Sequence, residues 1–583
     1  MIVAPKVLEI DFRGFLYPPF NPLSALKPII YQLLPRLFSN TCQSCTPNGD
    51  ILQNGCGKMN DITLQVIREI KKLGVTHIWY TGLLEHATQT DYSAYHIPSD
   101  HPAMVKGKAG SPYAVKDYYD IDPDLASHPD LRFQEFLDLL QRTHQEGVKV
   151  IMDFIPNHVA RQYRSDCTPK GISQLGENDS PDATFSPDNN FYYLSQPLHC
   201  QFDMQGEAPS PYQENPAKAT GNDCFSPSPT RNDWYETVKL NYGVDYTEGG
   251  RQYFDPIPDT WHKMLHILLF WASQGIDGFR CDMAEMVPVA FWQWAVNKVK
   301  YAYPNIIFIG EVYNPSLYRT FVHACRFDWL YDKVGLYDTL RSVTCGYQPA
   351  LDITRCWQNL EDISDHMLNF LENHDEQRLA SDFFIGDGRK GKAAVLVSSC
   401  LGRQPFMLYH GQEFGERGMD AEGFSGRDGR TTIFDYWSVP ALRRWMQGDN
   451  FDGSLLTEEE SDIYEFYKKI MNIAVNEPAI SDGDFFDLMY ANTCQQTFDS
   501  QHTFAFLRSH DHAQILVVAN FSDHDVEQKV IIPQHAFHCR QIPQGRQLCT
   551  DLLTGGQLSL DIWPDRKIPL FLPAYSGVLL KWE

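Results

Sequence analysis

The chain has 583 residues, of which 43% are hydrophobic and 13% aromatic, enough for two to four packed units, and this excludes disorder as the default. Its 49 basic and 74 acidic residues give a formal net charge of −25 at pH 7. A surface of that charge repels phosphate groups, so we expect neither nucleic acid nor an anionic membrane as a partner.

Residues 1–20 do not predict a secretory signal, because they lack a basic start followed by an apolar run and a small-residue cleavage site. No stretch reaches the roughly 18 apolar residues that a membrane span needs. The 14 cysteines lie at irregular spacings, which is typical of free thiols and not of a disulfide framework. We therefore expect a cytoplasmic location, although a mature secreted protein would also lack its signal.

A unit of amphipathic helix, glycine and short apolar strand recurs from residue 61 to about residue 450. In the first unit, we expect Asp61 to cap a helix that Gly74 ends, and a strand follows at residues 75–80. The pattern returns with strands at residues 148–153, 276–282, 305–311, 367–375 and 404–411. Apolar strands that alternate with helices predict a parallel sheet covered by helices.

Polar residues at the strand ends bear on whether this sheet is open or closed. Four strands end in carboxylate or histidine clusters, namely Asp153 with His158, Asp282, Glu311, and His374 with Asp375. In a barrel, the carboxyl ends of all strands converge on one face, where such sites lie. A doubly wound open sheet would show the same alternation, but the clusters favour a (β/α)8 TIM barrel of the α/β class.

Two stretches interrupt the alternation. Residues 160–250 are rich in Pro, Ser, Asn, Asp and Tyr and predict an insertion after the third strand. After about residue 480, short β-type runs predict a separate antiparallel domain. The expected organisation is the first part of the barrel at 1–158, an inserted domain at 159–250, the rest of the barrel at 251–478 and a C-terminal β-sandwich domain at 479–583. We expect residues 1–25 to be extended and to pack on the barrel.

Two carboxyl groups suit the cleavage of an acetal. Cleavage with retention needs a nucleophile and a general acid about 5–5.5 Å apart, in different surroundings. Arg280 and Asp282 are two residues apart on a strand and share one face, so the guanidinium should keep Asp282 ionised. Glu311 ends an apolar run, a position that suits a general acid. Taken alone, each carboxylate would more often cap the next helix.

Four short segments resemble the signature regions of the α-amylase family of glycoside hydrolases. They are DFIPNH (153–158), GFRCD (278–282), GEVY (310–313) and ENHD (372–375), in the family's order and each at a predicted strand end. With YQLLPRLF (31–38) as the first strand, the insertion and the terminal β domain, the resemblance covers most of the chain. It implies a retaining enzyme that cleaves α-1,4-glucosidic bonds in starch-type glucans or malto-oligosaccharides through a covalent glycosyl-aspartate intermediate.

The resemblance also implies a role for each residue of the site. Asp282 would be the nucleophile, Glu311 the general acid and base, and Asp375 the residue that grips hydroxyls of the sugar in subsite −1. The substrate-binding residues would be Tyr113, which stacks on that sugar, His158, Arg280 and His374. Asp153 would anchor the end of its strand.

Expectations about metals rest on the resemblance alone. Asn157 matches the position of a calcium-binding asparagine, so calcium is a candidate ligand there, and no organic cofactor is expected. Glu285 and Met286 stand where many α-amylases carry a Lys-His pair, which changes the acceptor-side contacts and removes one usual calcium ligand. A DxDxDG-type calcium loop is absent from the sequence.

Three other motifs carry weaker signals. Residues 386–393 imitate a phosphate loop but lack its final hydroxyl residue, which indicates a surface loop. His262 and His266 lack the glutamate of a zinc-protease motif and lie on a predicted helix. The cysteines within residues 42–56 have no fourth zinc ligand nearby.

Several alternative functions stay open. A transglycosylase, an α-1,6-glucosidase or a trehalose-forming isomerase of the same family would use the same carboxylates on another acceptor or linkage. An alternative of another class is a non-catalytic amylase-like binding protein, which the three intact carboxylates disfavour. The sequence makes no prediction of the oligomeric state.

Overall fold

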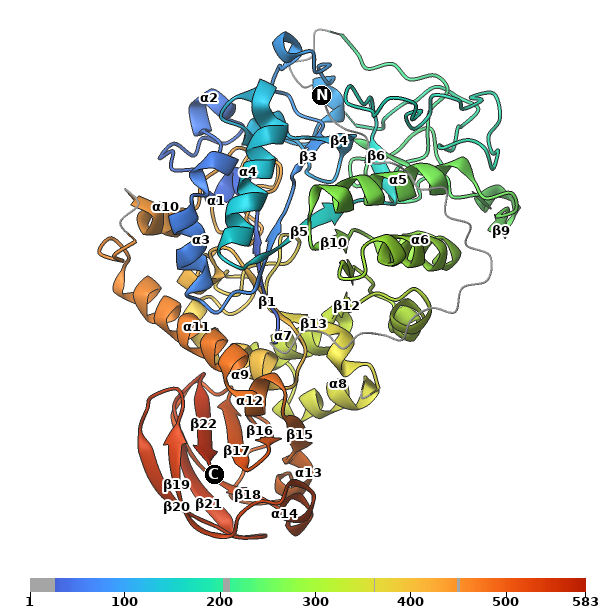
Figure 1. Ribbon diagram of the computed structural model, residues 1–583. Coiled ribbons are helices and arrows are strands. Elements are labelled where there is room, and N and C mark those ends of the chain that lie inside the picture. The colour runs from blue at the N-terminus through green and yellow to red at the C-terminus, as the bar shows by residue number, and fades with distance from the viewer. Residues whose placement is uncertain (1–26, 203–209, 361, 448–450) are drawn as a thin grey trace.

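The computed structural model describes residues 27–202, 210–360, 362–447 and 451–583, so the prediction for residues 1–25 lies outside the described residues. Eight parallel strands close into a barrel in the order β1-β14-β13-β12-β11-β10-β5-β2 (Figure 1). The barrel strands are β1 (Ile29–Leu33), β2 (His77–Tyr80), β5 (Lys149–Phe154), β10 (Gly278–Cys281), β11 (Ile307–Gly310), β12 (Trp329–Tyr331), β13 (Met367–Phe370) and β14 (Phe406–Tyr409). The predicted TIM barrel is therefore confirmed.

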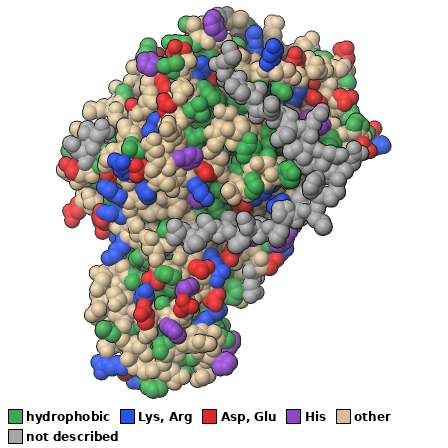
Figure 2. Space-filling view, viewed as in Figure 1, with side chains coloured by type: hydrophobic (Ala, Val, Ile, Leu, Met, Phe, Trp, Pro, Cys, Tyr) green, Lys and Arg blue, Asp and Glu red, His purple; other side chains and the backbone are tan. Residues whose placement is uncertain are grey.

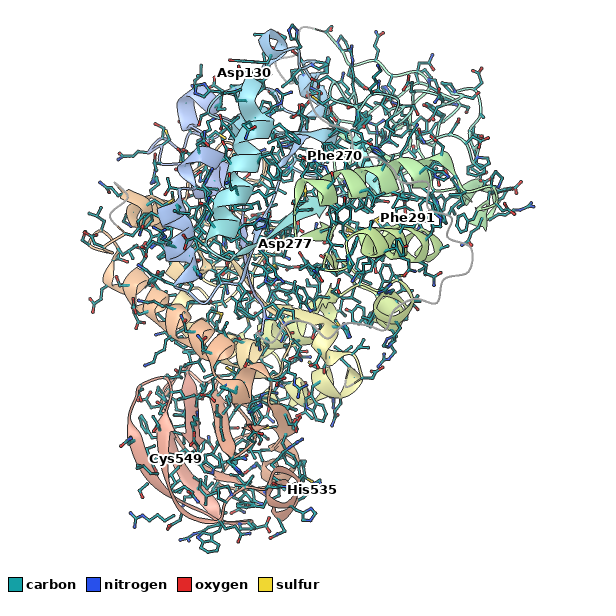
Figure 3. The ribbon with its side chains drawn as sticks, in the orientation of Figure 1. Asp130, Phe270, Asp277, Phe291, His535 and Cys549 are labelled. Atoms are coloured by element: carbon teal, nitrogen blue, oxygen red, sulfur yellow. The ribbon has the colours of Figure 1, made fainter. Side chains whose placement is uncertain are left out.

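Helices alternate with these strands and cover the outside of the barrel (Figure 1). They are α3 (Leu64–Lys71), α4 (Arg132–Gln145), α5 (Asp259–Gln274), α6 (Val289–Ala302), α7 (Asp338–Thr344), α8 (Ile353–Asn359), α9 (Lys392–Cys400) and α11 (Glu458–Asn476). Phe270 on α5 and Phe291 on α6 belong to the apolar layer between helices and strands (Figure 3). Asp277, labelled in the same view, accepts a hydrogen bond of 2.8 Å from the backbone N–H of Val150 and so joins the start of β10 to β5.

The inside of the barrel has its own apolar cluster. It is formed by side chains that point inward from the strands, among them Ile30, Trp79, Ile151, Ile309, Trp329, Tyr331, Leu368, Phe370 and Met407. All of these are buried, so the barrel has a packed core and is not a pore. Two of its aromatic members, Trp79 and Tyr331, lie beside Arg280 of the site described below.

Two local expectations were wrong. The first strand ends at Leu33, because Pro35 begins the short helix α1 (Pro35–Phe38), where its fixed φ suits the first turn. The cap of α3 is Thr63, whose hydroxyl accepts from the N–H of Val66 at 3.3 Å, and not Asp61. The sequence also gave no prediction for the three-residue strand β12, which is too short to show a pattern.

Long connections lie at one end of the barrel. Strand β2 is followed by a hairpin of β3 (Leu84–His86) and β4 (Val115–Ile121). Between β5 and α5 lies the largely irregular inserted segment, which holds β6 (His158–Ala160), β7 (Thr237–Lys239), β8 (Val244–Asp245) and β9 (Arg251–Gln252). Figure 1 shows this segment in green beside β6 and α5.

The chain ends in an antiparallel sheet that lies beyond α9, α11 and α12 (Pro478–Ser481) in Figure 1. Its strands are β15 (Asp484–Asp487), β16 (Thr503–His510), β17 (Ala513–Asn520), β22 (Gly577–Trp582), β19 (Gly545–Asp551) and β20 (Gln557–Ile562), with β18 (Val526–Ile531) and β21 (Lys567–Leu572) as a second pair. The buried guanidinium of Arg508 on β16 donates to the carbonyls of Leu401, Ala479, Ile480 and Gly483. These bonds join the sheet to the barrel.

In Figure 2, acidic and basic side chains are interspersed over the viewed face, and the coloured residues form no large basic area. Within the described residues, no helix combines the length and the apolar character that a membrane span requires. All 14 cysteines are free thiols.

The weak motifs of the sequence lie on ordinary structure. Residues 388–391 form a short 3-10 turn that leads into α9, with Asp387 capping the N–H of Arg389. His266 lies on α5, where its Nδ1 is 2.9 Å from the hydroxyl of Tyr119. The cysteines within 42–56 join no group of possible metal ligands in the described part of the chain.

Candidate active site

The predicted site residues meet at the carboxyl ends of the barrel strands. Asp282 follows β10 directly, and Glu311 follows β11 directly. His374 and Asp375 follow β13 after a short turn. Because the strands are parallel, the positions after their last residues lie around one rim of the barrel.

The guanidinium of Arg280 is the centre of the site. Its Nη1 donates to Oδ1 of Asp282 at 2.7 Å, and its Nη2 forms an ion pair of 2.8 Å with Oε2 of Glu311. Arg280 has no exposed surface, and the rings of Trp79, Tyr113 and Tyr331 lie 5.2, 5.5 and 5.4 Å from its guanidinium carbon. Arg280 therefore brings two of the three predicted carboxylates together among aromatic side chains.

Glu311 has two further donors. The backbone N–H of Met283 donates to Oε2 at 2.7 Å, and the hydroxyl of Tyr313 donates to Oε1 at 2.5 Å. The sequence motif contained Tyr313, but sequence reasoning gave it no role. Glu285 explains its placement, because its carboxylate accepts from the N–H groups of Tyr313 and Asn314 at 3.0 and 2.8 Å. Glu285, which departs from the family's usual lysine, thus fixes the turn after β11.

His374 links Asp375 to Gln32 on β1. Its Nε2 lies 3.0 Å from Oδ2 of Asp375, and its Nδ1 lies 2.8 Å from the amide nitrogen of Gln32 on β1. The ring of Tyr113 stacks on His374 at a centroid distance of 4.9 Å and an interplanar angle of 18°. Sequence reasoning missed Gln32 and Trp79, whose only signal was their place on predicted strands.

His158 and Asp153 complete the group. His158 is buried at the start of β6, its ring 5.2 Å from that of Trp234, and it interacts with the backbone of Tyr113. Burial lowers the pKa of His158 to about 3, so its imidazole is neutral. Asp153 accepts from the N–H of Gly82 at 3.1 Å, which joins the ends of β5 and β2 as expected of a structural residue.

The three carboxyl groups have different surroundings. Burial raises the pKa of Asp282 well above its usual range, and the neighbouring Glu311 adds to this, whereas Arg280 opposes it. The expected contact between Arg280 and Asp282 is present. Asp375 differs: desolvation is outweighed by His374, Arg280 and Arg430, which lower its pKa to about 2. Asp282 and Glu311 thus share one cation.

The surroundings of Asn157 do not fit calcium. Its amide oxygen accepts from the ammonium of Lys239 at 2.9 Å, and the same ammonium forms an ion pair of 2.5 Å with Asp223. Lys239 is 2% exposed, so its buried ammonium group already supplies a positive charge beside Asn157. A calcium ion there would have to displace a lysine, and the predicted calcium site at Asn157 is not supported by these contacts.

The comparisons with known proteins point to the family that the sequence motifs resemble. The model of the family "Alpha amylase, catalytic domain" matches residues 32–483. The chain is 26% identical over 394 residues to Alpha-amylase 3 of Dictyoglomus thermophilum, covering 64% of this chain and 68% of that protein. It is 24% identical to a cyclomaltodextrinase of a Bacillus species (87% and 76% covered) and 22% identical to Neopullulanase 2 of Thermoactinomyces vulgaris (96% and 78% covered).

Solved structures of similar fold span nearly the whole chain. A noncanonic maltogenic alpha-amylase from Thermotoga neapolitana superposes with a TM-score of 0.60 at 18% identity, covering 95% of this chain and 98% of that one. An alpha-amylase from Geobacillus thermoleovorans, solved with acarbose, gives a TM-score of 0.59 at 16% identity and covers 96% and 98%. At these identities the superpositions establish the shared fold.

Proposed function

Since this chain belongs to the alpha-amylase family of glycoside hydrolases, we propose that it hydrolyses α-1,4-glucosidic bonds in malto-oligosaccharides or starch-type glucans with retention of configuration. The observation that carries the proposal is the pairing of one buried guanidinium with two carboxylates. Arg280 contacts both Asp282 and Glu311, and His374 contacts Asp375. Retaining glycosidases need such a pair of carboxyl groups in unlike surroundings.

In the proposed mechanism, Asp282 and Glu311 act on opposite sides of the bond. An oxygen of Asp282 attacks the anomeric carbon, the bond to the leaving oxygen breaks, and Glu311 gives that oxygen a proton. Glu311 then takes a proton from water, whose oxygen displaces Asp282 and releases the sugar. The first step requires Glu311 to be protonated when the substrate is bound.

The neighbours of the pair suit a glucose ring in subsite −1. Tyr113 lies with its ring parallel to that of His374, so an aromatic face and an imidazole line the same wall. The carboxylate of Asp375 is 45% exposed and ionised, so it can accept hydrogen bonds from two sugar hydroxyls. We assign His158, as a neutral imidazole, to another hydroxyl of the same sugar.

Two of the relatives with the widest coverage are named for cyclomaltodextrins and pullulan. We therefore propose that the substrates include short or cyclic α-1,4 glucans. Transglycosylation, α-1,6 cleavage and isomerisation of maltose use the same pair of carboxylates and are alternative outcomes of one assay. The free thiols support our further proposal of a reducing, cytoplasmic location.

The test is a product profile. The enzyme is incubated with maltoheptaose, β-cyclodextrin, pullulan and maltose, and early products are followed by chromatography and by proton NMR of the anomeric signals. We expect maltoheptaose or the cyclic glucan to give shorter α-1,4 products, first as the α-anomer, and Asp282→Asn to give none. If the first product were the β-anomer, the reaction would not retain configuration. If only pullulan or maltose gave products, one of the alternative activities would be the correct one.

A further inference from the structure

Glu311 is held by the turn that follows β10. This 3-10 turn begins after Met283, whose backbone has a left-handed conformation with a φ of 43°, which is uncommon for a residue with a side chain. The N–H of Met283 donates to Oε2 of Glu311 at 2.7 Å. The next residue, Ala284, donates its N–H to the backbone oxygen of Glu311 at 3.0 Å. The segment after Asp282 therefore fixes both the side chain and the backbone of Glu311.

Glu285, the second residue of that turn, holds the residues that follow Glu311. Oε2 of Glu285 accepts from the N–H groups of Tyr313 and Asn314 at 3.0 and 2.8 Å. The hydroxyl of Tyr313 in turn donates to Oε1 of Glu311 at 2.5 Å. Burial raises the pKa of Tyr313, and the adjacent Glu311 adds to this, so the phenol keeps its proton. Glu285 and Tyr313 thus form a chain of contacts that ends on one oxygen of Glu311.

The two oxygens of Glu311 have different partners. Oε2 accepts from the N–H of Met283 and lies 2.8 Å from Nη2 of Arg280, and neither of these groups can accept a hydrogen bond. Oε1 contacts the hydroxyl of Tyr313, which can donate a hydrogen bond or accept one. A protonated Glu311 therefore keeps its contacts when the proton is on Oε1. The hydroxyl of Tyr313 suits both states of a group that must give a proton and take one back.

We propose that Tyr313, held in place by Glu285, is the positioning residue for the proton of the general acid, which Glu311 carries on Oε1. This inference rests on the proposed function. When Glu311 gives this proton to the leaving oxygen, the bond between that oxygen and the sugar breaks and Glu311 becomes a carboxylate. Tyr313 keeps its own proton and donates a hydrogen bond to Oε1, which stabilises the new charge. In the second step, Glu311 recovers a proton from water.

Several other ionisable groups surround the general acid. Arg280 and Asp282 face it from β10, and Tyr331 faces it from β12. Asp375 faces the hydroxyl of Tyr313 from the turn after β13. All of these groups are the same in the wild type and in a Tyr313→Phe variant. A difference in pH dependence between the two proteins therefore reports the hydroxyl of Tyr313.

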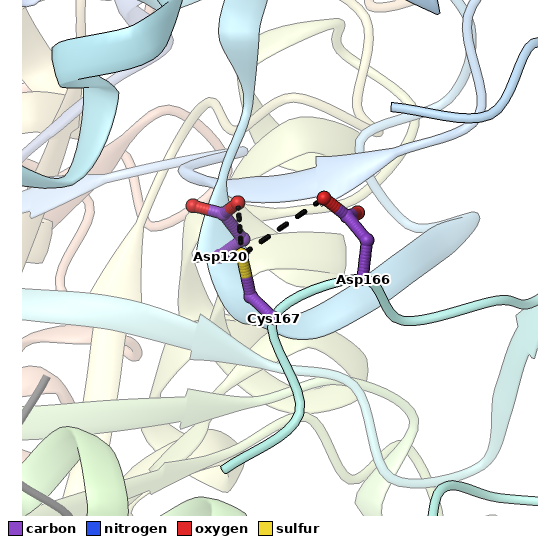
Figure 4. A group of neighbouring side chains, drawn as sticks. All are labelled: Asp120, Asp166 and Cys167. Carbon is purple, nitrogen blue, oxygen red and sulfur yellow. Dashed lines mark hydrogen bonds between the residues drawn. The ribbon is translucent and has the colours of Figure 1, made fainter. Parts of the chain in front are cut away.

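An acidic group outside this site supplies a control (Figure 4). It consists of Asp120 on β4 and of Asp166 and Cys167, which follow β6. The thiol of Cys167 donates to Oδ2 of Asp120 at 3.0 Å, and the carboxylate of Asp166 lies 3.8 Å from Arg132 on α4. Because Asp166 is exposed and faces a cation outside the site, Asp166→Asn should leave the reaction unchanged.

The test compares Tyr313→Phe with the wild type on two substrates. The leaving group of maltoheptaose needs a proton, whereas that of α-maltosyl fluoride does not. On maltoheptaose, we expect kcat to fall by about 10- to 100-fold and KM to change by less than about twofold, because the lost hydrogen bond stabilises a charge that forms only as the proton leaves. On the fluoride, kcat should fall by about threefold or less, since no charge develops on Glu311 when the fluoride leaves.

The pH profile gives a second readout. In Tyr313→Phe, the alkaline limb of kcat/KM on maltoheptaose should move to higher pH by about 0.5–1.5 units. The hydroxyl favours the carboxylate over the protonated form of Glu311, because a hydrogen bond to a charged group is the stronger one. Its removal lets Glu311 keep the proton to higher pH. A merely structural role of Tyr313 would lower kcat at every pH without moving this limb.

Glu285 is tested by two replacements that differ in their acceptor atoms. Glu285→Gln keeps an oxygen that can accept from both N–H groups, so it should retain most of the activity. Glu285→Ala has no acceptor and should lose activity on maltoheptaose but much less on the fluoride, as Tyr313→Phe does. The controls are Asp166→Asn and Tyr347→Phe, which removes the hydroxyl of a residue that is 84% exposed. Thermal unfolding shows whether each variant is folded, and Tyr313→Phe alone decides the test if Glu285→Ala is not.

Three results would overturn the proposal. Tyr313→Phe could keep the kcat and the pH profile of the wild type, or it could lose equal activity on both substrates, or folded Glu285→Gln and Glu285→Ala could behave alike. In these cases the wild type still cleaves maltoheptaose and Asp282→Asn does not, so the proposed function stands. If the wild type acts on neither substrate, the proposed function is wrong and this inference is wrong with it.

Discussion

Nη2 of Arg280 lies 2.8 Å from Oε2 of Glu311, so the cation that the sequence assigned to Asp282 is shared with the second carboxylate. With Nη1 on Asp282 at 2.7 Å, one guanidinium sets the position of both groups of the proposed reaction. Each carboxylate can therefore be changed to its amide while the other still holds Arg280. This makes the two roles separable by substitution.

Asp282→Asn removes the proposed nucleophile with little change in shape. We expect kcat on maltoheptaose to fall by about 1,000-fold or more, because no covalent intermediate can form. Tm should change by little, since Arg280 keeps its ion pair with Glu311. Steady-state kinetics and thermal unfolding measure the two effects, with the exposed Asp130→Asn as a control. Retention of more than a few per cent of activity would refute the role of Asp282.

Glu311→Gln should give a different pattern, because it removes a proton donor. With maltoheptaose, kcat should fall by about 100- to 10,000-fold. A maltosyl substrate whose leaving group needs no proton, such as the fluoride, should still form the intermediate, and azide should speed its breakdown because a charged nucleophile needs no base. Equal losses on both substrates, with no effect of azide, would show that Glu311 is not the acid and base.

The sequence predicted the barrel because its strands are buried on both faces and its helices on one, which gives two distinct periodicities. Charged residues beside apolar runs also predicted that Asp282 and Glu311 lie at strand ends, as the structure shows, whereas the roles of the site residues came from the resemblance. The sequence did not predict β12, since three residues show no period. Nor could it predict side-chain contacts, whether within one motif, as between Tyr313 and Glu311, or between distant segments, as between Lys239 and Asn157 across 82 positions.

Lys239 is expected to act as the internal cation at Asn157. Lys239→Met keeps the length of the side chain but leaves the buried amide oxygen of Asn157 without its donor, which costs about 1–3 kcal/mol. Asp223 is 42% exposed, so water can replace the ammonium of Lys239 as its partner. The loss of this ion pair should therefore add little to the cost in unfolding free energy. Thermal or urea unfolding against the exposed control Lys170→Met measures this cost, and an unchanged Tm would show that the contact contributes nothing.

Glu413 should make stability fall as the pH rises. Burial raises the pKa of this carboxyl to about 7, although the hydroxyl of Tyr31 donates to it at 2.5 Å. A carboxyl whose pKa is higher in the folded than in the unfolded protein stabilises fully below its unfolded value of about 4.3, and this stabilisation is lost as the pH rises through 7.

Glu413→Gln removes the titrating group and keeps the size of the side chain. The difference in unfolding free energy between wild type and variant should therefore change by about 2–3 kcal/mol between pH 4.5 and pH 8, with the wild type losing more. Other buried acids, such as Glu372 with a pKa of about 7, titrate in both proteins and cancel in this difference. Tm values measured across this range, with the exposed Glu458→Gln as control, give the result; parallel profiles for wild type and Glu413→Gln would mean that Glu413 is ionised throughout.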